Sequence, residues 1–278
     1  MLKVVFAVAL AAGAVSPAKM ADVSSLKNDY NPSFDRAERL MVFARSEADF
    51  QQARIFVSEK RRGRWSEPAP IPFTDARFSD TDPWLTPDGR TLYFISNRPT
   101  PSDPAKKDLD IWRAQRAGSG WGAPEHLGNV VNSRGPELGV EYRDGTLTFA
   151  SVRKGGKGGL DIYSARLGAN GFQAPVLLDG PFNTAESDSD FTISEDGRRA
   201  AFWRGSGGSG AIYVADRIGA TWSQPARLDG RINLGPFNFT PTFGRDGRSL
   251  WYASTRARPG QAEGMADIYV ATLPTRPK

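Results

Sequence analysis

Cysteine is absent from the 278-residue chain, and histidine occurs once, as His126. The lack of cysteine excludes disulfide bonds, zinc–thiolate centres and cysteine nucleophiles. The single histidine removes most histidine-based metal and catalytic sites. After residue 14, no apolar run approaches the roughly 20 residues of a membrane-spanning helix, and no apolar stripe of helical period is long enough to predict a helix. We therefore expect no transmembrane segment in the mature protein.

The charge is nearly balanced, because 36 lysines and arginines face 31 aspartates and glutamates. Nucleic-acid-binding proteins concentrate basic residues on one element, whereas the basic residues of this chain are scattered through predicted turns, so we expect no nucleic-acid partner. Residues 1–14, MLKVVFAVALAAGA, combine one lysine with an apolar run and an Ala-x-Ala-type cleavage site. This pattern predicts a signal peptide and a periplasmic or secreted protein.

Three markers recur along the chain in a constant order, which indicates an internal repeat. Isoleucine-centred tripeptides lie 50 to 56 residues apart, at Arg54-Ile55-Phe56, Asp110-Ile111-Trp112, Asp161-Ile162-Tyr163, Ala211-Ile212-Tyr213 and Asp267-Ile268-Tyr269. An aromatic-x-x-Pro marker follows the first four of them, starting at Trp65, Trp121, Phe172 and Trp222. An Asp-Gly turn precedes the last four, at Asp88-Gly89, Asp144-Gly145, Asp196-Gly197 and Asp246-Gly247.

Each repeat predicts four short β-strands separated by turns. In the second repeat these are DPWLT, TLYFIS, LDIWRAQ and WGAPEHL. TLYFIS alternates and is rich in aromatic and β-branched residues. A Pro-Asp-Gly-Arg turn, a polar loop and a Gly-Ser-Gly turn separate the four. Four strands in about 50 residues are typical of a β-propeller blade. The sequence predicts an all-β, five-bladed propeller over residues 15–278, with blades at about 32–73, 74–128, 129–180, 181–230 and 231–278.

The motif D-P-x-L-T-P-D-G-R-x-L-Y-F-x-S-x-R followed by D-I-Y/W resembles the WD40-like, or PD40, repeat of TolB-type bacterial propellers. The second blade (74–128) fits this motif best, whereas the first has Ala37-Glu38 in place of the Asp-Gly turn. The resemblance covers nearly the whole chain after residue 14 and implies a propeller fold rather than a particular activity. TolB itself usually has six blades, so the five copies leave its partners unsupported for this chain.

The last repeat lacks its own outermost strand, and the N-terminus offers a replacement. Residues Pro17-Ala18-Lys19-Met20 resemble Pro225-Ala226-Arg227-Leu228, which end the fourth repeat. We predict that residues 17–25 supply the outermost strand of the last blade. This exchange would close the ring and cover an edge that would otherwise favour aggregation.

Carboxylates begin the innermost strands, which line the channel of a propeller. Alignment on the Asp-Gly turns places Asp82 with Asn31, Asp190, Thr240 and, across a one-residue gap, Glu137. Three interpretations remain open: capping of backbone N–H groups before each strand, binding of a cation such as Ca²⁺ in the central channel, and glycoside hydrolysis. For the third, Asp82, Glu137 and Asp190 are similar in kind to the three channel acids of arabinanase-type five-bladed enzymes, and Trp84 would be the aromatic platform.

The loops between the second and third strands of each blade vary in length and sequence. In propellers, variable loops of this kind usually determine binding specificity. Three of them begin with Arg98, Arg153 and Arg256. We expect a monomeric, non-enzymatic scaffold of the cell envelope that needs no cofactor and binds an envelope protein, a peptide or a glycan through the channel-mouth face. The alternative is a glycoside hydrolase or lyase. The candidate binding residues are Asp80, Asp82, Trp84, Arg98, Glu137, Arg153, Asp188, Asp190, Asn238 and Arg256.

Overall fold

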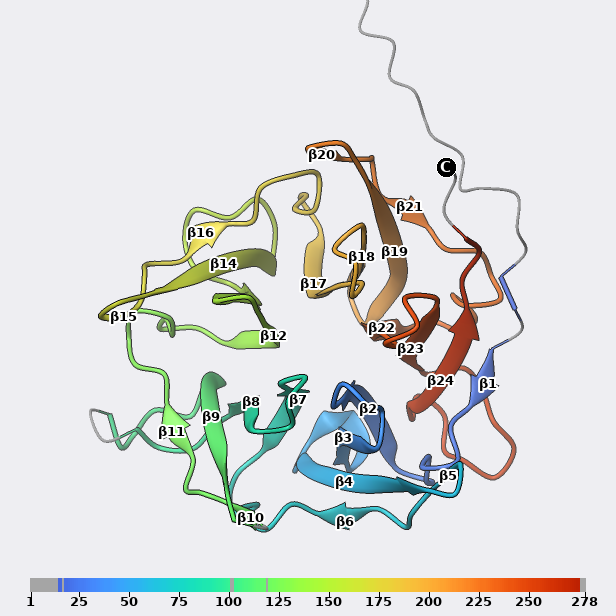
Figure 1. Cartoon of the computed structure of the whole chain (residues 1–278), viewed down its shortest axis with the longest axis horizontal. Helices are drawn as coiled ribbons and strands as arrows, with labels where there is room; N and C mark the ends of the chain where they lie inside the picture. The colour runs from blue at the N-terminus through green and yellow to red at the C-terminus, as the bar shows by residue number, and fades with distance from the viewer. Residues whose placement is uncertain (1–14, 17, 101–102, 119, 276–278) are drawn as a thin grey trace, which may run out of the picture.

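Five antiparallel sheets follow one another around a ring in the computed structural model (Figure 1), which describes residues 15–16, 18–100, 103–118 and 120–275. The predicted five-bladed, all-β propeller is confirmed. The predicted signal peptide, residues 1–14, lies outside the described residues.

Each of the first four blades has three long strands and an outer strand split into two short pieces. Blade 1 contains β2 (Asn28–Phe34), β3 (Leu40–Ser46), β4 (Arg54–Arg61), β5 (Arg64–Trp65) and β6 (Ala69–Pro70). Blade 2 contains β7 (Asp80–Leu85), β8 (Thr91–Ser96), β9 (Asp110–Ala117), β10 (Gly120–Trp121) and β11 (Glu125–His126). In both, the two short pieces pair with the third long strand.

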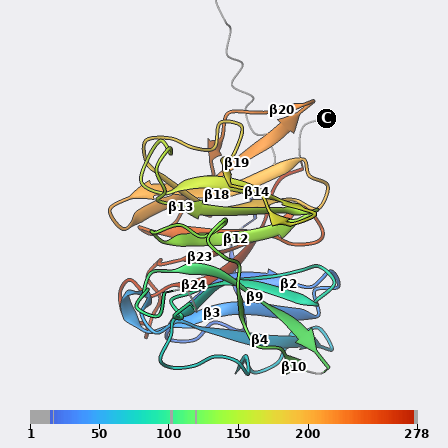
Figure 2. The ribbon, with the colours of Figure 1, turned by 90° about the vertical axis from the view of Figure 1, so that its left-hand side faces the viewer.

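Blades 3 and 4 repeat this plan. Blade 3 contains β12 (Glu137–Arg143), β13 (Thr146–Ser151), β14 (Asp161–Gly168), β15 (Gly171–Phe172) and β16 (Val176–Leu177). Blade 4 contains β17 (Ser187–Ile193), β18 (Arg199–Ser206), β19 (Ser209–Ile218), β20 (Thr221–Trp222) and β21 (Ala226–Arg227). Figure 2 shows the ring from the side, where the strands β12, β13 and β14 lie above β2, β3 and β4. The only helical segment among the described residues is the 3-10 turn η1 (Ala48–Phe50), between β3 and β4.

Blade 5 is assembled from both ends of the chain, as predicted, although the N-terminal strand is shorter than the predicted residues 17–25. Its strands are β22 (Asn238–Phe243), β23 (Ser249–Ser254), β24 (Asp267–Thr272) and, on the outer edge, β1 (Lys19–Met20). Lys19 pairs with Val270 and Met20 with Tyr269. Backbone hydrogen bonds extend the pairing on both sides, from Ser16 to Thr272 and from Ala21 to Ile268. Figure 1 shows β1 beside β24 at the right of the ring.

The recurrent aromatic and aliphatic residues pack between blades, so the core is divided into a series of interfaces. Between blades 4 and 5, for example, Ile212 and Val214 join Leu250 and Tyr252 in one buried cluster. A single blade cannot bury both of its faces, and radial stacking provides the missing contacts. The aromatic repeat positions therefore serve the architecture of the ring.

Candidate functional site

Every innermost strand carries a β-bulge at the same place, and the bulge turns one residue toward the channel. The strand register shifts within β2, β7, β12, β17 and β22. A bulge kinks the strand and re-aims a side chain. The bulged residue has a positive φ in all five blades: Asn31 (52°), Asp82 (47°), Gly139 (56°), Asp190 (54°) and Thr240 (49°).

These residues form a belt of hydrogen bonds from blade to blade. The Asp82 carboxylate accepts the N–H of Gly139 at 2.8 Å, and the Asp190 carboxylate accepts the N–H of Thr240 at 3.1 Å. The Thr240 hydroxyl oxygen accepts the N–H of Asn31 at 3.2 Å. The belt side chains therefore cap the inner strand of the next blade. The capping within one turn that the sequence suggested is found two residues earlier, where Asp29, Glu137 and Asp188 accept the N–H groups of Ser25, Ser133 and Thr184.

Glu137 is not a member of the belt, because Gly139 occupies that position in blade 3. Glu137 pairs with Ser151 across the sheet, as Asp80 pairs with Ser96, so it is equivalent to Asp80 rather than to Asp82. The alignment that grouped Glu137 with Asp82 and Asp190 is corrected accordingly. A Cβ atom on Gly139 would lie 2.4 Å from an Asp190 side-chain oxygen, so the close approach of the two blades favours glycine here.

A second ring of acids lies two residues before the belt, and each acid is paired with an arginine. The carboxylate–guanidinium distances are 2.6 to 3.0 Å in the pairs Asp29–Arg45, Asp80–Arg98, Glu137–Arg153 and Asp188–Arg204. Burial raises the pKa of each of these carboxyl groups, while the arginine hydrogen bonds or charge oppose that shift. In blade 5, Asn238 replaces the acid and accepts a hydrogen bond from Ser254.

Two of these arginines, and Arg256 in blade 5, connect their blades to the segment that precedes each blade. Arg98 donates to the carbonyl of Phe73, Arg153 to that of Val131, and Arg256 to that of Ile232. Each guanidinium also lies over an aromatic ring. The sequence offered these arginines as ligand contacts, but all three have structural partners. The Arg98 side chain is 13% exposed and that of Arg153 is 16% exposed.

A pocket of about 210 Å³ opens above the belt, at the end of the channel where the inner strands begin. One part of its wall is a continuous group of aromatic rings from blades 1, 4 and 5, namely Tyr30, Phe50, Trp203, Phe237 and Phe239. The rings pack on one another: Phe237 stacks on Phe239 with centroids 4.3 Å apart, and Trp203 meets Phe237 edge-on at 5.4 Å. Leu109 and Leu138 add an aliphatic wall.

The floor of the pocket holds the two belt carboxylates, and each also accepts a hydroxyl hydrogen bond, Asp82 from Thr81 at 2.9 Å and Asp190 from Ser189 at 3.4 Å. Burial raises the pKa of Asp190 to about 8, and the charge of Asp82 adds to the increase. Burial also raises the pKa of Asp82, although the Gly139 N–H opposes it. The side-chain oxygen of Asn31 is buried and has no hydrogen-bond partner among the described residues. These three side chains line the same pocket, so its floor can accept a group that brings hydrogen-bond donors and positive charge.

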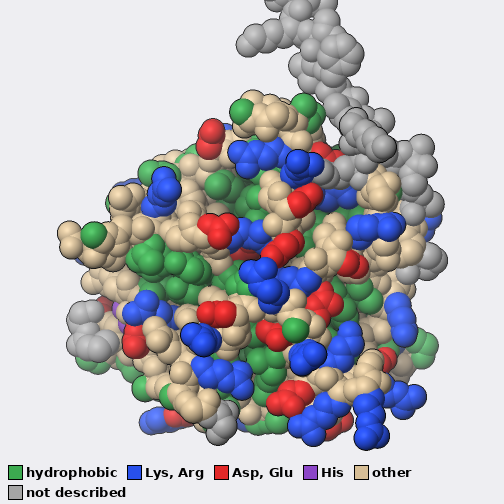
Figure 3. Space-filling view, in the orientation of Figure 1, with side chains coloured by type: hydrophobic (Ala, Val, Ile, Leu, Met, Phe, Trp, Pro, Cys, Tyr) green, Lys and Arg blue, Asp and Glu red, His purple; other side chains and the backbone are tan. Residues whose placement is uncertain are grey.

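Other candidates from the sequence lie elsewhere. Trp84 is 9% exposed and borders a small space on the other side of the belt, with Gly139 and Asp190. His126 contacts Asp110 at 3.0 Å and Asn132 at 2.9 Å, and so belongs to the outer part of blade 2. The face seen in Figure 3 carries basic and acidic side chains interspersed with one another.

The aromatic wall was not recognised from the sequence, because its members occupy different places in different repeats. Phe50 lies in η1, Phe237 precedes β22, and Trp203 lies in β18. Trp203 did leave a signal. It occupies the repeat position that holds Ile95 in blade 2 and Ala150 in blade 3, so a large aromatic residue replaces a smaller aliphatic one there.

Within the described residues, no cluster of three or more histidine, cysteine, aspartate or glutamate side chains has the arrangement of a metal site. In the same part of the chain, no helix has the length and apolar character needed to cross a membrane.

No protein-family model matches this chain. No curated protein matches it in sequence. Solved structures do match its fold. A thermostable family-43 glycoside hydrolase superposes with a TM-score of 0.59 at 10% identity, over 93% of this chain and 97% of that one. The putative TolB from Agrobacterium tumefaciens gives a TM-score of 0.52 at 12% identity, over 90% of this chain and 81% of that one.

TolB from Acinetobacter baumannii gives a TM-score of 0.51 at 15% identity, and the match covers 88% of this chain but only 55% of that structure. This chain is thus similar in fold to TolB-like propellers and to propeller glycosidases. Since one fold serves many functions, and all these identities are low, the similarity establishes the architecture alone.

Proposed function

We propose that this protein is a non-enzymatic binding module whose channel-mouth pocket receives a basic side chain of a peptide or protein partner. The observation that carries the proposal is the combination of an aromatic wall with the acceptor floor formed by Asn31, Asp82 and Asp190. Aromatic faces attract cations, and buried carboxylates that repel one another are stabilised by a positive charge. With about 30 Å³ per water as a guide, a space of about 210 Å³ has room for a side chain.

The proposal extends the TolB-like fold similarity to a PD40-type repeat protein of the cell envelope. The support for that extension is the recurring P-D-G-R and D-I-Y/W motifs and the signal-like residues 1–14. An organic cation suits the pocket better than Ca²⁺, which takes six to eight oxygen ligands.

The enzymatic alternative, glycoside hydrolysis by Asp82, Glu137 and Asp190, has less support. Glu137 is fully buried against Arg153 and does not line the pocket. Each remaining acid uses one carboxylate oxygen to cap a neighbouring strand. Without a third acid, the arrangement that motivated the alternative is incomplete.

Titration calorimetry with N-acetyl-arginine methylamide tests the proposal, and its neutral isostere N-acetyl-citrulline methylamide is the control ligand. We expect the arginine compound to bind at least about tenfold more tightly, which corresponds to ~1.4 kcal/mol. Asp82→Asn/Asp190→Asn should abolish this preference, whereas Asp88→Asn/Asp144→Asn, which removes the same charge from exposed turns, should keep it. Equal binding of the two ligands would contradict the proposal. Hydrolysis of arabino-oligosaccharides that the first variant loses would establish the enzymatic alternative instead.

A further inference from the structure

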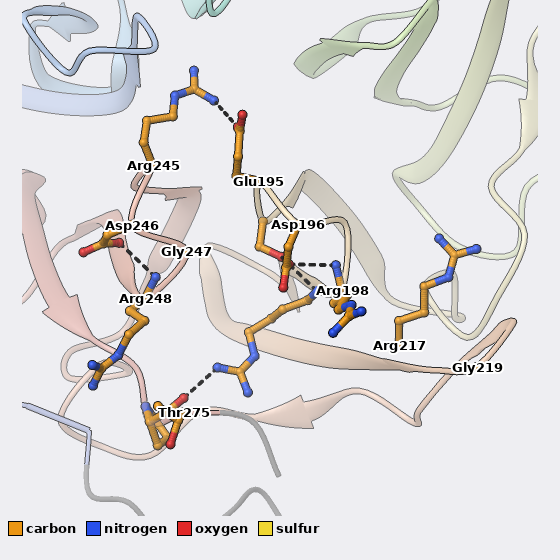
Figure 4. Close-up of a pocket in the computed structure, with 13 residues that line it drawn as sticks. Glu195, Asp196, Arg198, Arg217, Gly219, Arg245, Asp246, Gly247, Arg248 and Thr275 are labelled. Carbon is orange, nitrogen blue, oxygen red and sulfur yellow. Dashed lines mark hydrogen bonds and ion pairs between the residues drawn. The ribbon is translucent and has the colours of Figure 1, made fainter. Parts of the chain in front are cut away.

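A large open groove of about 920 Å³ lies between blades 4 and 5. It is formed by the turns that follow the inner strands β17 and β22, the β19–β20 hairpin and the end of the chain after β24. The channel pocket lies where the inner strands begin, so the groove belongs to the opposite face of the ring. Figure 4 shows that its side chains come from the two blades, with Arg217 and Arg248 on opposite sides of the groove.

Arginines dominate the lining of the groove. Five of them line it, against three acidic residues: Arg198, Arg199, Arg217, Arg245 and Arg248 against Glu195, Asp196 and Asp246. The carboxylates are engaged in local structure. Glu195 pairs with Arg245 at 3.1 Å and with Arg36 at 3.3 Å.

The two aspartates hold their own turns. Asp196 accepts hydrogen bonds from the Ser194 hydroxyl and the Arg198 N–H. Asp246 accepts the N–H groups of Arg248 and Ser249 and the Ser249 hydroxyl, and these bonds lower its pKa despite partial burial. The acids of the groove are therefore held in place by the protein, and the five arginines outnumber them, so the lining has an excess of positive charge.

Two of the arginines build the groove, and others face it. Arg199 is 3% exposed, binds Asp216 at 2.7 Å and donates to the Pro274 carbonyl. Arg245 donates to the Phe34 carbonyl in blade 1. By contrast, Arg217 and Arg248 are exposed, and no carboxylate lies within 4 Å of either guanidinium among the described residues. Arg217 rests on the ring of Trp222 at 5.5 Å, which orients its guanidinium.

We propose that this groove is an anion-binding site for a phosphorylated ligand, which Arg217 of blade 4 and Arg248 of blade 5 hold together. Guanidinium groups bind phosphate through two parallel N–H···O bonds, and planar stacking on an aromatic ring keeps the fork oriented. Two arginines from different blades suit a ligand that presents phosphate oxygens on more than one side. The buried Arg199 and the engaged Arg245 fix the walls between them.

The repeat supplies a matched control for this proposal. Arg90 and Arg116 of blade 2 occupy the same positions as Arg248 and Arg217: Arg90 donates its N–H to Asp88 as Arg248 does to Asp246, and Arg116 rests on Trp121 at 5.4 Å. Neither lines the groove. The variants Arg217→Gln/Arg248→Gln and Arg90→Gln/Arg116→Gln therefore lose equal charge from equivalent sites.

Calorimetric titration with inorganic pyrophosphate, and sedimentation with phosphatidylcholine vesicles that contain or lack phosphatidic acid, test the site on the full chain. We expect binding in at least one arm, a loss of at least tenfold in Arg217→Gln/Arg248→Gln, and unchanged binding in the blade 2 variant. Pyrophosphate binding alone would identify a soluble phosphate as the source, and vesicle binding alone a lipid headgroup. Equal losses in both variants, or no binding of the wild type in either arm, would overturn the proposal.

Discussion

At the scale of single residues, burial disfavours the ionised form of the two belt acids, Asp82 and Asp190. Asp82 and Asp190 are buried together, and burial and mutual repulsion raise the pKa of Asp190 to about 8. In the unfolded chain an aspartate titrates near 3.9. Between these two values the folded protein holds a proton that the unfolded chain has released. The Asp190 carboxyl therefore contributes a loss of folding stability as the pH rises from about 4 to about 8.

The variant Asp190→Asn tests this link between charge and stability. Its side chain keeps an oxygen for the Thr240 N–H but cannot ionise, so we expect its melting temperature to exceed that of the wild type at pH 9 by at least ~3 °C, the change for roughly 1 kcal/mol. The difference should shrink toward pH 4. Thermal melts across this range measure it. Asp267 and Glu141 also have raised pKa values, so the wild-type slope is not due to Asp190 alone, and the comparison isolates its share.

Asp144→Asn is the control for this measurement, because Asp144 lies in an exposed turn with a positive φ that asparagine also accepts. It should follow the wild-type profile at every pH. Parallel profiles for Asp190→Asn and the wild type would show that Asp190 is ionised in the folded protein throughout.

Most of the belt residues could be predicted from the sequence repeat. The exception is Gly139 in blade 3, and its cause is the length of the turn that follows. In blades 2, 4 and 5 the belt residue lies six positions before the Asp-Gly aspartate, as Asp82 does before Asp88. Blade 3 instead uses a two-residue hairpin, in which Asp144 and Gly145 both have positive φ. The shorter turn moves Gly139 into the belt, and no property of Glu137 itself reveals that shift.

At the scale of elements, the two-residue strand β1 forms the outer edge of blade 5 by pairing with β24. Its own side chains, Lys19 and Met20, are exposed, but the flanking Val15, Ala21 and Val23 are buried against blades 4, 5 and 1. The prediction of this strand succeeded because the Pro-Ala-Lys-Met motif repeats the end of blade 4. The aromatic wall could not be predicted in this way, because Phe50, Trp203 and Phe237 do not recur from one repeat to the next. The repeated motifs therefore predicted the strands and blades, but they gave no information on the residues that differ from blade to blade.

Deletion of residues 15–26 should strongly destabilise the propeller. Two buried valines alone correspond to about 3–6 kcal/mol, and at roughly 2–4 °C per kcal/mol the melting temperature should fall by about 6–24 °C. The deletion also exposes the edge of β24, which should promote aggregation. Differential scanning calorimetry and light scattering measure the two effects.

The variant Lys19→Ala/Met20→Ala is the control for the deletion, since it retains the backbone pairing with β24 and changes only exposed side chains. Its melting temperature should stay close to that of the wild type. A deletion variant that melts at the wild-type temperature would mean that blade 5 is complete without β1.

At the scale of the whole molecule, the ring is closed by backbone pairing inside one blade. Side chains pack at every blade interface, but only in blade 5 do strands from both ends of the chain share a sheet. Ser16 and Thr272 are hydrogen-bonded to each other through the backbone, so a short linker can join the chain ends there. New ends can then be opened elsewhere, which separates the effect of closure within a blade from that of the blades themselves.

Two circular permutants with the same linker make this comparison. Opening between Pro104 and Ala105, both exposed, divides blade 2 between the two new ends and again closes the ring inside a sheet. Opening between Ala76 and Arg77, also exposed, leaves every blade continuous, so the ring closes mainly by side-chain packing between blades 1 and 2. We expect the first permutant to unfold near the wild-type urea midpoint and the second at a clearly lower concentration, because ring opening there breaks few backbone hydrogen bonds. Equal midpoints would mean that packing between blades is sufficient to hold the ring, and that the exchange of β1 serves edge protection alone.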